Sequence, residues 1–369
     1  MSSDIEWTDE TWNPVVGCTP VSPGCLNCYA ATMAPRLAAM GQEVYVGLTV
    51  KRGGFKVVEN GENHGGEPGS LAITDHAKRY VFNGTVRTLP DRLTDPLGWK
   101  KPRQVFVNSM SDLFHESVPF EFIDRVFALM ALTPRHTYQI LTKRPERMAE
   151  YMNTVDRFEQ NVYERAMDMA PWHISDRADY CEEYVQTWPL PNVWLGTSVE
   201  DQKRADERIP WLLKTPAAVR FLSCEPLLGS IDLRKAMPIA LFHCSECGNE
   251  KRSPDCAKCG TQDNEASNAI RGIDWVIVGG ESGAKSKIRW CNVEWIREIV
   301  TQCKAAKVPV FVKQMGTNPI AKYTEATGAI IRPQLQPAFL PLKLKSRKGN
   351  DMKEWSKDLR VREMPKVVS

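Results

Sequence analysis

Three cysteines stand close together near the start of the sequence, at Cys18, Cys25 and Cys28. Two prolines and a glycine between the first two can bend the loop, so that the spacing C-x6-C-x2-C lets the three thiols converge. Three thiolates are one short of a closed tetrahedral zinc site, and they suit a four-iron, four-sulfur (4Fe-4S) cluster whose fourth iron stays open for a substrate or cofactor. The same spacing also fits a zinc site completed by a distant histidine or carboxylate, or thiols that bind no metal.

Four further cysteines have the spacing C-x2-C-x8-C-x2-C, and they are Cys244, Cys247, Cys256 and Cys259. Two such pairs supply four thiolates to one tetrahedral ion, so we predict a structural zinc site, with an auxiliary iron–sulfur cluster as the alternative. The stretch from His243 to Asn268 carries a net charge of −2, which favours a scaffold or a partner surface over a phosphate clamp. The remaining cysteines are isolated, and we expect buried thiols, although Cys224 beside Glu225 is a candidate hydrogen donor.

Seven apolar, β-branched runs recur along the chain, and helical or polar segments separate them. This alternation predicts a parallel α/β protein, in which right-handed crossovers place the carboxyl ends of all strands on one side. Polar residues follow nearly every run, which favours a full or partial (β/α) barrel over an open doubly wound sheet. The predicted strands are 12–17, 104–108, 137–141, 192–196, 219–223, 274–278 and 309–312.

The expected organisation is a barrel interrupted by one insertion and followed by a basic extension. Residues 1–240 and 270–320 form the barrel, 241–269 the four-cysteine metal-binding insertion, and 321–369 the C-terminal extension. Between Lys343 and Lys366 there are nine Lys or Arg residues and four acidic ones, although the whole chain of 369 residues has a net charge of only +3. This local excess of positive charge is compatible with a phosphate-bearing partner, or with a solvated surface helix.

Polar side chains at the strand ends are candidate ligand contacts. One such charge would be a helix cap or a surface ion pair, but ionisable groups at five of six ends favour a polar pocket on the active face. We assign candidate catalytic roles to Glu225, Glu281 and Cys224, and candidate cofactor contacts to Lys143, Glu200 and Lys313, with Gln314 as a further pocket residue.

Several motifs carry a family resemblance that spans most of the chain. They are Ile5–Pro14, 17–30, Leu141–Pro145, Leu195–Glu200, Ser223–Gly229, Trp275–Gly283, Val312–Gly316 and Trp355–Pro365. Together they resemble the three-Cys-motif phage proteins, a divergent branch of the radical S-adenosylmethionine (SAM) enzymes. The resemblance implies a partial barrel whose three N-terminal cysteines hold a 4Fe-4S cluster, with SAM chelating the open iron. Reductive cleavage of SAM would give methionine and a 5'-deoxyadenosyl radical that abstracts hydrogen from a substrate.

The chain departs from the better-known radical SAM enzymes in two ways. Their first two cysteines are usually separated by three residues rather than six. They also carry a Gly-Gly-Glu-like stretch after the second strand to bind the ammonium group of SAM, whereas Gly279-Gly-Glu281 here follows the sixth strand. The stretch after the second strand instead contains Asn108, Ser109, Ser111 and Asp112. Their hydroxyls and carboxylate suit an ammonium group, and helix capping is the alternative interpretation.

The sequence therefore predicts a radical SAM enzyme that depends on an electron donor, with a nucleobase or nucleotide in nucleic acid as the expected substrate. A small molecule or a peptide is the alternative substrate. In a different class, the chain would be a zinc-stabilised nucleic-acid- or protein-binding module without redox chemistry. The chain has no apolar run of 18 residues and a polar start, so we expect a cytoplasmic protein with no membrane partner.

Overall fold

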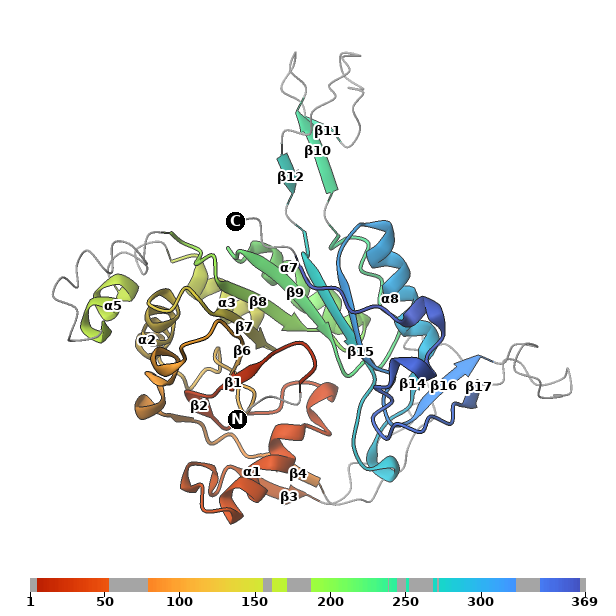
Figure 1. Ribbon diagram of the computed structural model, residues 1–369, viewed down its shortest axis with the longest axis horizontal. Coiled ribbons are helices and arrows are strands. Elements are labelled where there is room, and N and C mark those ends of the chain that lie inside the picture. The colour runs from red at the N-terminus through yellow and green to blue at the C-terminus, as the bar shows by residue number, and fades with distance from the viewer. Residues whose placement is uncertain are drawn as a thin grey trace, which may run out of the picture.

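The computed structural model describes residues 5–52, 79–154, 161–170, 187–237, 239–243, 250–251, 268–270, 272–322 and 339–365. Its centre is a parallel sheet of seven strands that curls into a half-barrel flanked by helices (Figure 1). In spatial order the strands are β1 (Glu10–Trp12), β6 (Gln104–Val107), β7 (Thr137–Thr142), β8 (Val193–Ser198), β9 (Val219–Cys224), β13 (Trp275–Gly279) and β15 (Val310–Gln314). The structure thus agrees with the partial form of the predicted parallel barrel.

The first strand differs from its prediction. The parallel strand β1 ends at Trp12, and Val15–Val16 forms a separate short strand, β2, that pairs antiparallel with β5 (Arg87–Thr88). Pro14 lies between them and has no N–H to donate to a sheet ladder, which explains the break. The other six predicted runs each overlap one strand of the half-barrel.

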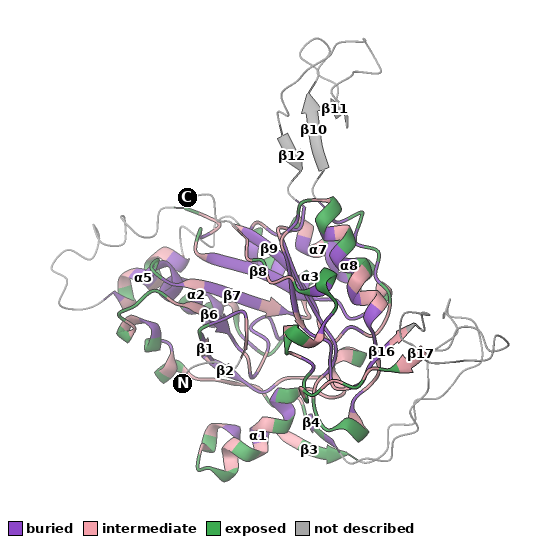
Figure 2. Cartoon of the chain, turned by 45° about the vertical axis from the view of Figure 1, so that its right-hand side comes forward, coloured by how far each residue is buried: buried purple, intermediate pink, exposed green. Residues whose placement is uncertain are grey.

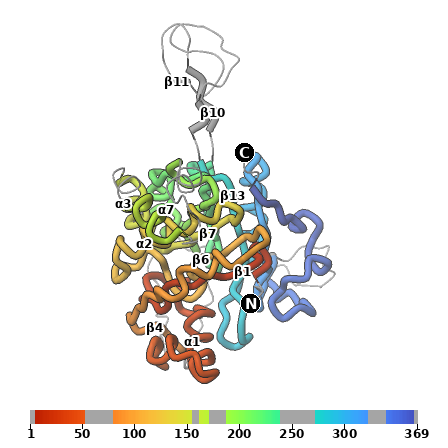
Figure 3. The backbone as a smooth tube through the Cα atoms, turned by 60° about the vertical axis from the view of Figure 1, so that its left-hand side comes forward, coloured from red at the N-terminus to blue at the C-terminus, as the bar shows by residue number. Residues whose placement is uncertain are grey.

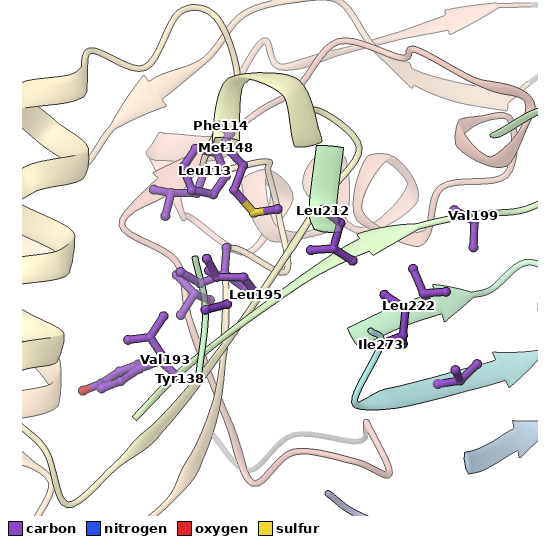
Figure 4. Close-up of a cluster of buried hydrophobic side chains, with 14 of the residues drawn as sticks. Leu113, Phe114, Tyr138, Met148, Val193, Leu195, Val199, Leu212, Leu222 and Ile273 are labelled. Carbon is purple, nitrogen blue, oxygen red and sulfur yellow. The ribbon is translucent and has the colours of Figure 1, made fainter. Parts of the chain in front are cut away.

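Helices cover the outer, convex face of the sheet. They are α2 (Phe120–Ala131), α3 (Pro145–Met152), α7 (Gln202–Lys214) and α8 (Val293–Ala305), and α5 (Tyr163–Met169) packs against α2. Figure 2 shows the strands buried beneath them, and β8, β9 and β13 are buried along their whole length, as expected for parallel strands covered on both faces. Figure 4 shows part of the core between these layers, where Leu195 of β8, Leu222 of β9 and Leu212 of α7 belong to one apolar cluster.

The inner, concave face of the sheet is filled by aromatic side chains. Trp275 of β13 makes tilted or edge-to-face contacts with Trp7, Trp194, Phe221 and Phe311, at centroid distances of 5.6 to 6.3 Å. These rings form a second apolar cluster inside the half-barrel. A polar site is therefore left to the strand ends and the loops that follow them.

The N-terminal part of the chain forms a small unit at one end of the half-barrel. Helix α1 (Tyr29–Ala39) packs against the hairpin of β3 (Thr49–Arg52) and β4 (Arg79–Phe82), and Figure 3 shows α1 and β4 together below the sheet. Its own apolar cluster includes Val16, Leu48 and Met110, the last of which comes from the segment after β6. This contact joins the unit to the carboxyl end of β6.

The C-terminal segment covers an edge of the sheet. Val312 of the edge strand β15 donates its N–H to the carbonyl of Val361, and Glu363 donates to the carbonyl of Val310. Trp355 is buried and belongs to the main core. The segment predicted as a basic extension thus packs on the half-barrel and pairs with its exposed edge. A further sheet beside it consists of β14 (Cys291–Asn292), β16 (Pro319–Lys322) and β17 (Phe339–Pro341).

A small antiparallel sheet projects from the body between β9 and β13 (Figure 1). It consists of β10 (Ile239–His243), β11 (Glu250–Lys251) and β12 (Asn268–Ile270). The four cysteines of the predicted zinc site, at positions 244, 247, 256 and 259, lie outside the described residues. Among the helices within the described ranges, none is long and apolar enough to cross a membrane.

Candidate functional site

The three N-terminal cysteines line one pocket at the carboxyl ends of β6, β7 and β8. The pocket has a volume of about 150 Å³. Its apolar walls include Phe82, Phe106 and Leu141. The polar residues that the sequence placed after the second and third strands also line it, namely Asn108, Ser109, Ser111, Asp112 and Lys143. Few polar groups within apolar walls are typical of a ligand site.

The cysteine loop, defined here as residues 18–28, begins after a glycine at which any side chain would be strained. Gly17 has a φ of +88°, and a Cβ at this position would lie 2.1 Å from the carbonyl oxygen of Thr85. The loop then forms a short 3-10 turn, Pro23–Cys25, and Cys28 lies at the N-cap of α1. Two of the three thiols are thereby carried on or next to hydrogen-bonded turns rather than on an extended segment.

Glu200, predicted to contact a cofactor, holds the cysteine loop. Its Oε1 accepts the backbone N–H of Gly24 at 3.2 Å, and its Oε2 accepts from Nη1 of Arg208 in α7 at 2.9 Å. The side chain of Glu200 is fully buried. Burial would raise the pKa of Glu200, but Arg208 and then Lys143 outweigh it and lower the pKa below its usual value. Glu200 is thus an ionised anchor for the loop.

Glu281, predicted to be catalytic, holds the loop at a second point. Its carboxylate accepts from Nδ2 of Asn27 at 2.8 Å and from both the backbone and the guanidinium of Arg289. Arg289 also donates to the carbonyl of Pro23, and Arg79 donates to Oδ1 of Asn27. Asn27 lies between Cys25 and Cys28, so these contacts fix the part of the loop that carries two of the thiols.

Arg144 lies beside the first thiol, and the sequence analysis did not select it. Its Nη1 is 3.9 Å from Sγ of Cys18 and 3.1 Å from Oδ2 of Asp112, and its Nη2 donates to the carbonyl of Thr19. Pro145 begins α3 directly after it, which ends β7 and leaves Lys143 and Arg144 at the strand end. The sequence does signal this position, because Arg144 stands inside the Leu141–Pro145 motif.

His115 is a second residue that the sequence analysis missed. It is 1% exposed, its Nε2 is 2.9 Å from Oγ1 of Thr19, and its Nδ1 accepts the backbone N–H of Ser117. This pattern fits a neutral ring with its proton on Nε2. Burial, followed by the charge of Arg144, lowers the pKa of His115. His115 therefore supports the start of the cysteine loop in its uncharged form.

Asp112 is buried, and its carboxylate is fully used by the protein. Oδ1 accepts from Oγ1 of Thr142 at 2.7 Å and from the N–H of Phe114, and Oδ2 accepts from the N–H of Lys143 at 3.0 Å and from Arg144. An ionised carboxylate has about four lone-pair positions, and all four are taken. The structure therefore does not support the expected contact between Asp112 and a ligand ammonium group.

The two serines next to Asp112 also make internal contacts. Oγ of Ser109 is 3.1 Å from Oδ1 of Asn13, and Oγ of Ser111 donates to the carbonyl of Val15 at 2.8 Å. Tyr29, at the start of α1, donates its hydroxyl to the carbonyl of Ser109. These bonds connect the segment after β6 to the N-terminal unit.

Glu225 and Lys313 form an ion pair with each other. Nζ of Lys313 is 2.9 Å from both carboxylate oxygens of Glu225, and Nε2 of Gln314 is 3.0 Å from Oε1. None of the three is among the residues that line the pocket with the cysteines. Both charges of the pair are thus neutralised at the ends of β9 and β15, where the sequence predicted ligand contacts.

Cys224 lies in the core rather than in the pocket. It is fully buried in the cluster between the sheet and the helices, and successive side chains of β9 alternate, so that Phe221 lies in the concave cluster and Cys224 in the convex one. Burial raises the pKa of its thiol well above the usual value. The structure therefore gives no support to the predicted role of Cys224 as a hydrogen donor.

The surroundings of Cys18 and Cys28 favour the protonated forms of these two thiols in the protein alone. Burial, followed by the nearby Asp112 carboxylate, raises the pKa of Cys18 to about 12, while Arg144 acts in the opposite direction. Burial also raises the pKa of Cys28. Binding of a metal centre to these thiolates would therefore release protons.

The described residues include no group of three or more His, Cys, Asp or Glu side chains placed to hold one metal ion. Thiolates around one zinc at about 2.3 Å would lie roughly 4 Å apart. In a 4Fe-4S cluster each cysteine binds a different iron, so the sulfur atoms are more widely separated. A cluster therefore needs a wider spacing of the three thiols than a single zinc ion does.

A family model described as "Protein of unknown function (DUF5131)" matches residues 2–358. The chain belongs to the DUF5131 family. No curated protein and no solved structure matches the chain. The DUF5131 match includes the cysteine loop, all seven strands of the half-barrel and most of the C-terminal segment, so the candidate site lies inside the DUF5131 domain.

Proposed function

We propose that this protein is a radical SAM enzyme in which Cys18, Cys25 and Cys28 bind a 4Fe-4S cluster. The observation that carries the proposal is the placement of the three thiols in one pocket at the carboxyl ends of parallel strands in a half-barrel. Among the described residues that line this pocket there is no other cysteine and no histidine, and Asp112 has no free oxygen. This donor set provides three ligands and leaves a fourth position for a cofactor.

The residues around the thiols suit a buried, negatively charged metal centre. Arg144 and Lys143 place two cations on the pocket wall, and the charge of Lys143 acts against the burial that raises the pKa of Cys28. The apolar side chains of Phe82, Phe106 and Leu141 limit access of water. The clamps formed by Glu200 and Glu281 hold the loop in place. When bound, the cluster and SAM would supply reductive cleavage of the sulfonium and a 5'-deoxyadenosyl radical.

A nucleobase or nucleotide within nucleic acid is the substrate class that we propose. The support is the basic segment 343–348, in which Lys343, Lys345, Arg347 and Lys348 are exposed. No ion pair in the described part of the chain involves any of these four residues. The side chain of Glu354 accepts the N–H groups of Lys345 and Ser346, so the segment has a fixed backbone that presents unpaired cations.

The test is to purify the protein without oxygen and to measure iron, sulfide, zinc and visible absorption. We expect about four irons per chain at the three-cysteine site, and release of 5'-deoxyadenosine when the reduced protein is given SAM. Replacing Cys18, Cys25 and Cys28 together by Ala should abolish both. The matched control is Cys303→Ala, which removes a buried core thiol and should leave both intact. A colourless protein that contains zinc and no iron would refute the proposal and favour a binding module.

A further inference from the structure

The loop that leads from β13 to β14, residues 282–290, is linked to the basic segment 343–348. We call residues 282–290 the connecting loop. Oγ1 of Thr317 accepts the backbone N–H of Gly283 at 3.0 Å, and it donates to the carbonyl of Arg347 at 3.0 Å. One hydroxyl group therefore joins the connecting loop to the basic segment.

The connecting loop also contacts the cysteine loop. The carbonyl of Lys287 accepts from Nδ2 of Asn27 at 3.0 Å, and Nη1 of Arg289 donates to the carbonyl of Pro23 at 2.9 Å. The connecting loop thus lies between the basic segment and the loop that carries the three thiols. A molecule bound along the first would reach the second by way of residues 282–290.

Both the connecting loop and the basic segment are positively charged. The connecting loop contains three Lys or Arg residues and no acidic residue, and the basic segment contains four and none. Lys285 is exposed, and in the described part of the chain it takes part in no ion pair. Nδ2 of Asn318 donates to its carbonyl at 2.8 Å, so the backbone that carries this cation is fixed. Such an excess of positive charge attracts a polyanion.

Trp290, the last residue of the connecting loop, is an aromatic residue without a place in the core. It is partly exposed and belongs to none of the three apolar clusters. Among the described residues, its side chain has no ring contact and no hydrogen bond. The backbone is held on both sides, because Arg289 donates its N–H to Glu281 and Cys291 donates to the carbonyl of Asn318. A tryptophan presented in this way is suited to stacking on a ligand ring.

We propose that the connecting loop binds the substrate strand, with Trp290 stacked on an unpaired base and Lys285 against a phosphate, while the basic segment holds phosphates further along. This inference rests on the proposed function and gives the substrate a place and a form. Cations alone would fit any polyanion, including an acidic protein. An aromatic ring beside them favours nucleic acid, because every base offers a π-face for stacking. Chemistry on a base also requires the base to leave the duplex stack.

The test measures the affinity of the full-length protein, with its cluster and without SAM, for two labelled DNA strands by fluorescence anisotropy. One is a short oligothymidylate, and the other has the same length but lacks the bases of its central nucleotides. The unmodified protein should bind the complete strand about 5- to 100-fold more tightly, the range expected when one base stacks on an aromatic side chain. Trp290→Leu should lose most of this preference, and Trp290→Phe should keep part of it.

The matched control is Trp211→Leu on α7, because Trp211 is also partly exposed and lies outside the three apolar clusters. It should keep the full preference. Lys285→Gln should reduce the slope of log affinity against log salt by about 0.7, the value for one phosphate contact on a single strand. Equal affinities of the unmodified protein for the two strands, or an unchanged preference in Trp290→Leu, would overturn the inference. Competition by polyglutamate as strong as that by oligothymidylate would also overturn it, in favour of an acidic protein partner.

Iron content and release of 5'-deoxyadenosine are measured on the same preparations. Trp290→Leu should equal the unmodified protein in both, because the connecting loop serves the substrate and not the cleavage of SAM. Loss of iron in Trp290→Leu would show that Trp290 supports the cysteine loop, and it would overturn the inference while leaving the proposed function intact. Absence of iron from the unmodified protein would instead refute the proposed function, so the two failures give different results.

Discussion

The backbone N–H of Gly24 donates a 3.2 Å hydrogen bond to Oε1 of Glu200, and this bond joins the cysteine loop to the end of β8, 176 positions away. A Cβ on Gly24 would lie 3.0 Å from the same oxygen, so the contact is close. The carboxylate is held in turn by Arg208, which also donates to the carbonyl of Ser198. The loop is therefore fixed by a buried ion pair that does not itself line the pocket.

Replacing Glu200 by Gln should destabilise the protein strongly. The glutamine oxygen can still accept from Gly24, but Arg208 would keep its charge in a buried position without a counter-ion. Breaking a buried pair by removing one charge costs about 3–5 kcal/mol. Urea unfolding measures the loss. The control is Glu207→Gln, whose pair with Lys203 is exposed and separated by 3.9 Å, and it should change the unfolding free energy by less than about 0.5 kcal/mol. Similar small losses in both variants would contradict the assignment.

Replacing Asn27 by Ala should impair iron retention more than folding. The change removes the hydrogen bonds to Glu281, to the carbonyl of Lys287 and from Arg79, so the segment between Cys25 and Cys28 loses its anchor. We expect a clear fall in iron per chain after anaerobic reconstitution and gel filtration, with little change in melting temperature.

The control for Asn27 is Asn153→Ala at the end of α3, which removes two side-chain hydrogen bonds to backbone carbonyl groups and lies away from the loop. It should retain its iron. Asn27→Asp should be worse than Asn27→Ala, because it would place a second carboxylate against Glu281. If Asn27→Ala held as much iron as the unmodified protein, the loop anchor would not matter for the metal centre.

The strands could be predicted from the sequence because buried parallel strands have continuous apolar runs. The partners of the charged residues at the strand ends could not be predicted. Glu200 pairs with Arg208 and Glu281 with Arg289, each eight positions later, and the sequence analysis assigned both glutamates to ligands. No local periodicity relates a strand end to an arginine eight positions along. The pairing follows from the crossing of loop, strand and helix in space.

The contribution of Arg144 was hidden for a similar reason. Its partner Asp112 lies 32 positions earlier, after a different strand, and only the parallel pairing of β6 with β7 brings them together. Asp112 could be recognised as a strand-end polar residue, but the sequence does not show that four protein donors already surround it. The sequence therefore left the carboxylate of Asp112 without visible partners, and for this reason a contact with an ammonium group was predicted.

Replacing Cys224 by Ala should lower stability without affecting chemistry. The thiol is fully buried in the core, so its loss leaves a small cavity that costs about 1 kcal/mol. Iron content and release of 5'-deoxyadenosine should stay unchanged. Thermal unfolding measures the first effect, and chromatography of the reaction products the second. A variant of normal stability that cleaves SAM but no longer modifies its substrate would restore the hydrogen-donor hypothesis.

Protonation of His115 should destabilise the protein in mild acid. Its pKa is lowered in the folded state, whereas the unfolded chain takes up a proton near pH 6.5. The folded state therefore binds fewer protons, and the stabilisation is present above about pH 6.5 and is lost as the pH falls below it. The neighbouring charges are those of Asp112, Glu116, Arg144 and Arg147.

The measurement for His115 is the free energy of unfolding at about pH 7.5 and pH 5, which lie on either side of the unfolded pKa. His115→Gln can still donate to Thr19 but does not titrate, so its stability should fall less over this range than that of the unmodified protein. Equal losses in the two proteins would show that other groups control the acid sensitivity.

Removing charge from the basic segment should weaken binding to nucleic acid. Lys345, Arg347 and Lys348 are exposed on a fixed backbone, and the hydroxyl of Thr317 donates to the carbonyl of Arg347. If each cation contacts one phosphate, changing the three to Gln should reduce the slope of log affinity against log salt by up to about 3 for a DNA duplex. Fluorescence anisotropy at several salt concentrations measures this slope.

The matched control for the basic segment changes three exposed lysines elsewhere, Lys100, Lys101 and Lys235, to Gln. It alters the net charge by the same amount, so a general electrostatic effect would weaken binding equally in both triple variants. A specific surface predicts a loss confined to the first variant, with the slope of the control close to that of the unmodified protein. If both variants bind the duplex as the unmodified protein does, or if vesicles of anionic lipid bind more tightly than DNA, the segment does not serve nucleic acid and the proposed substrate class loses its structural support.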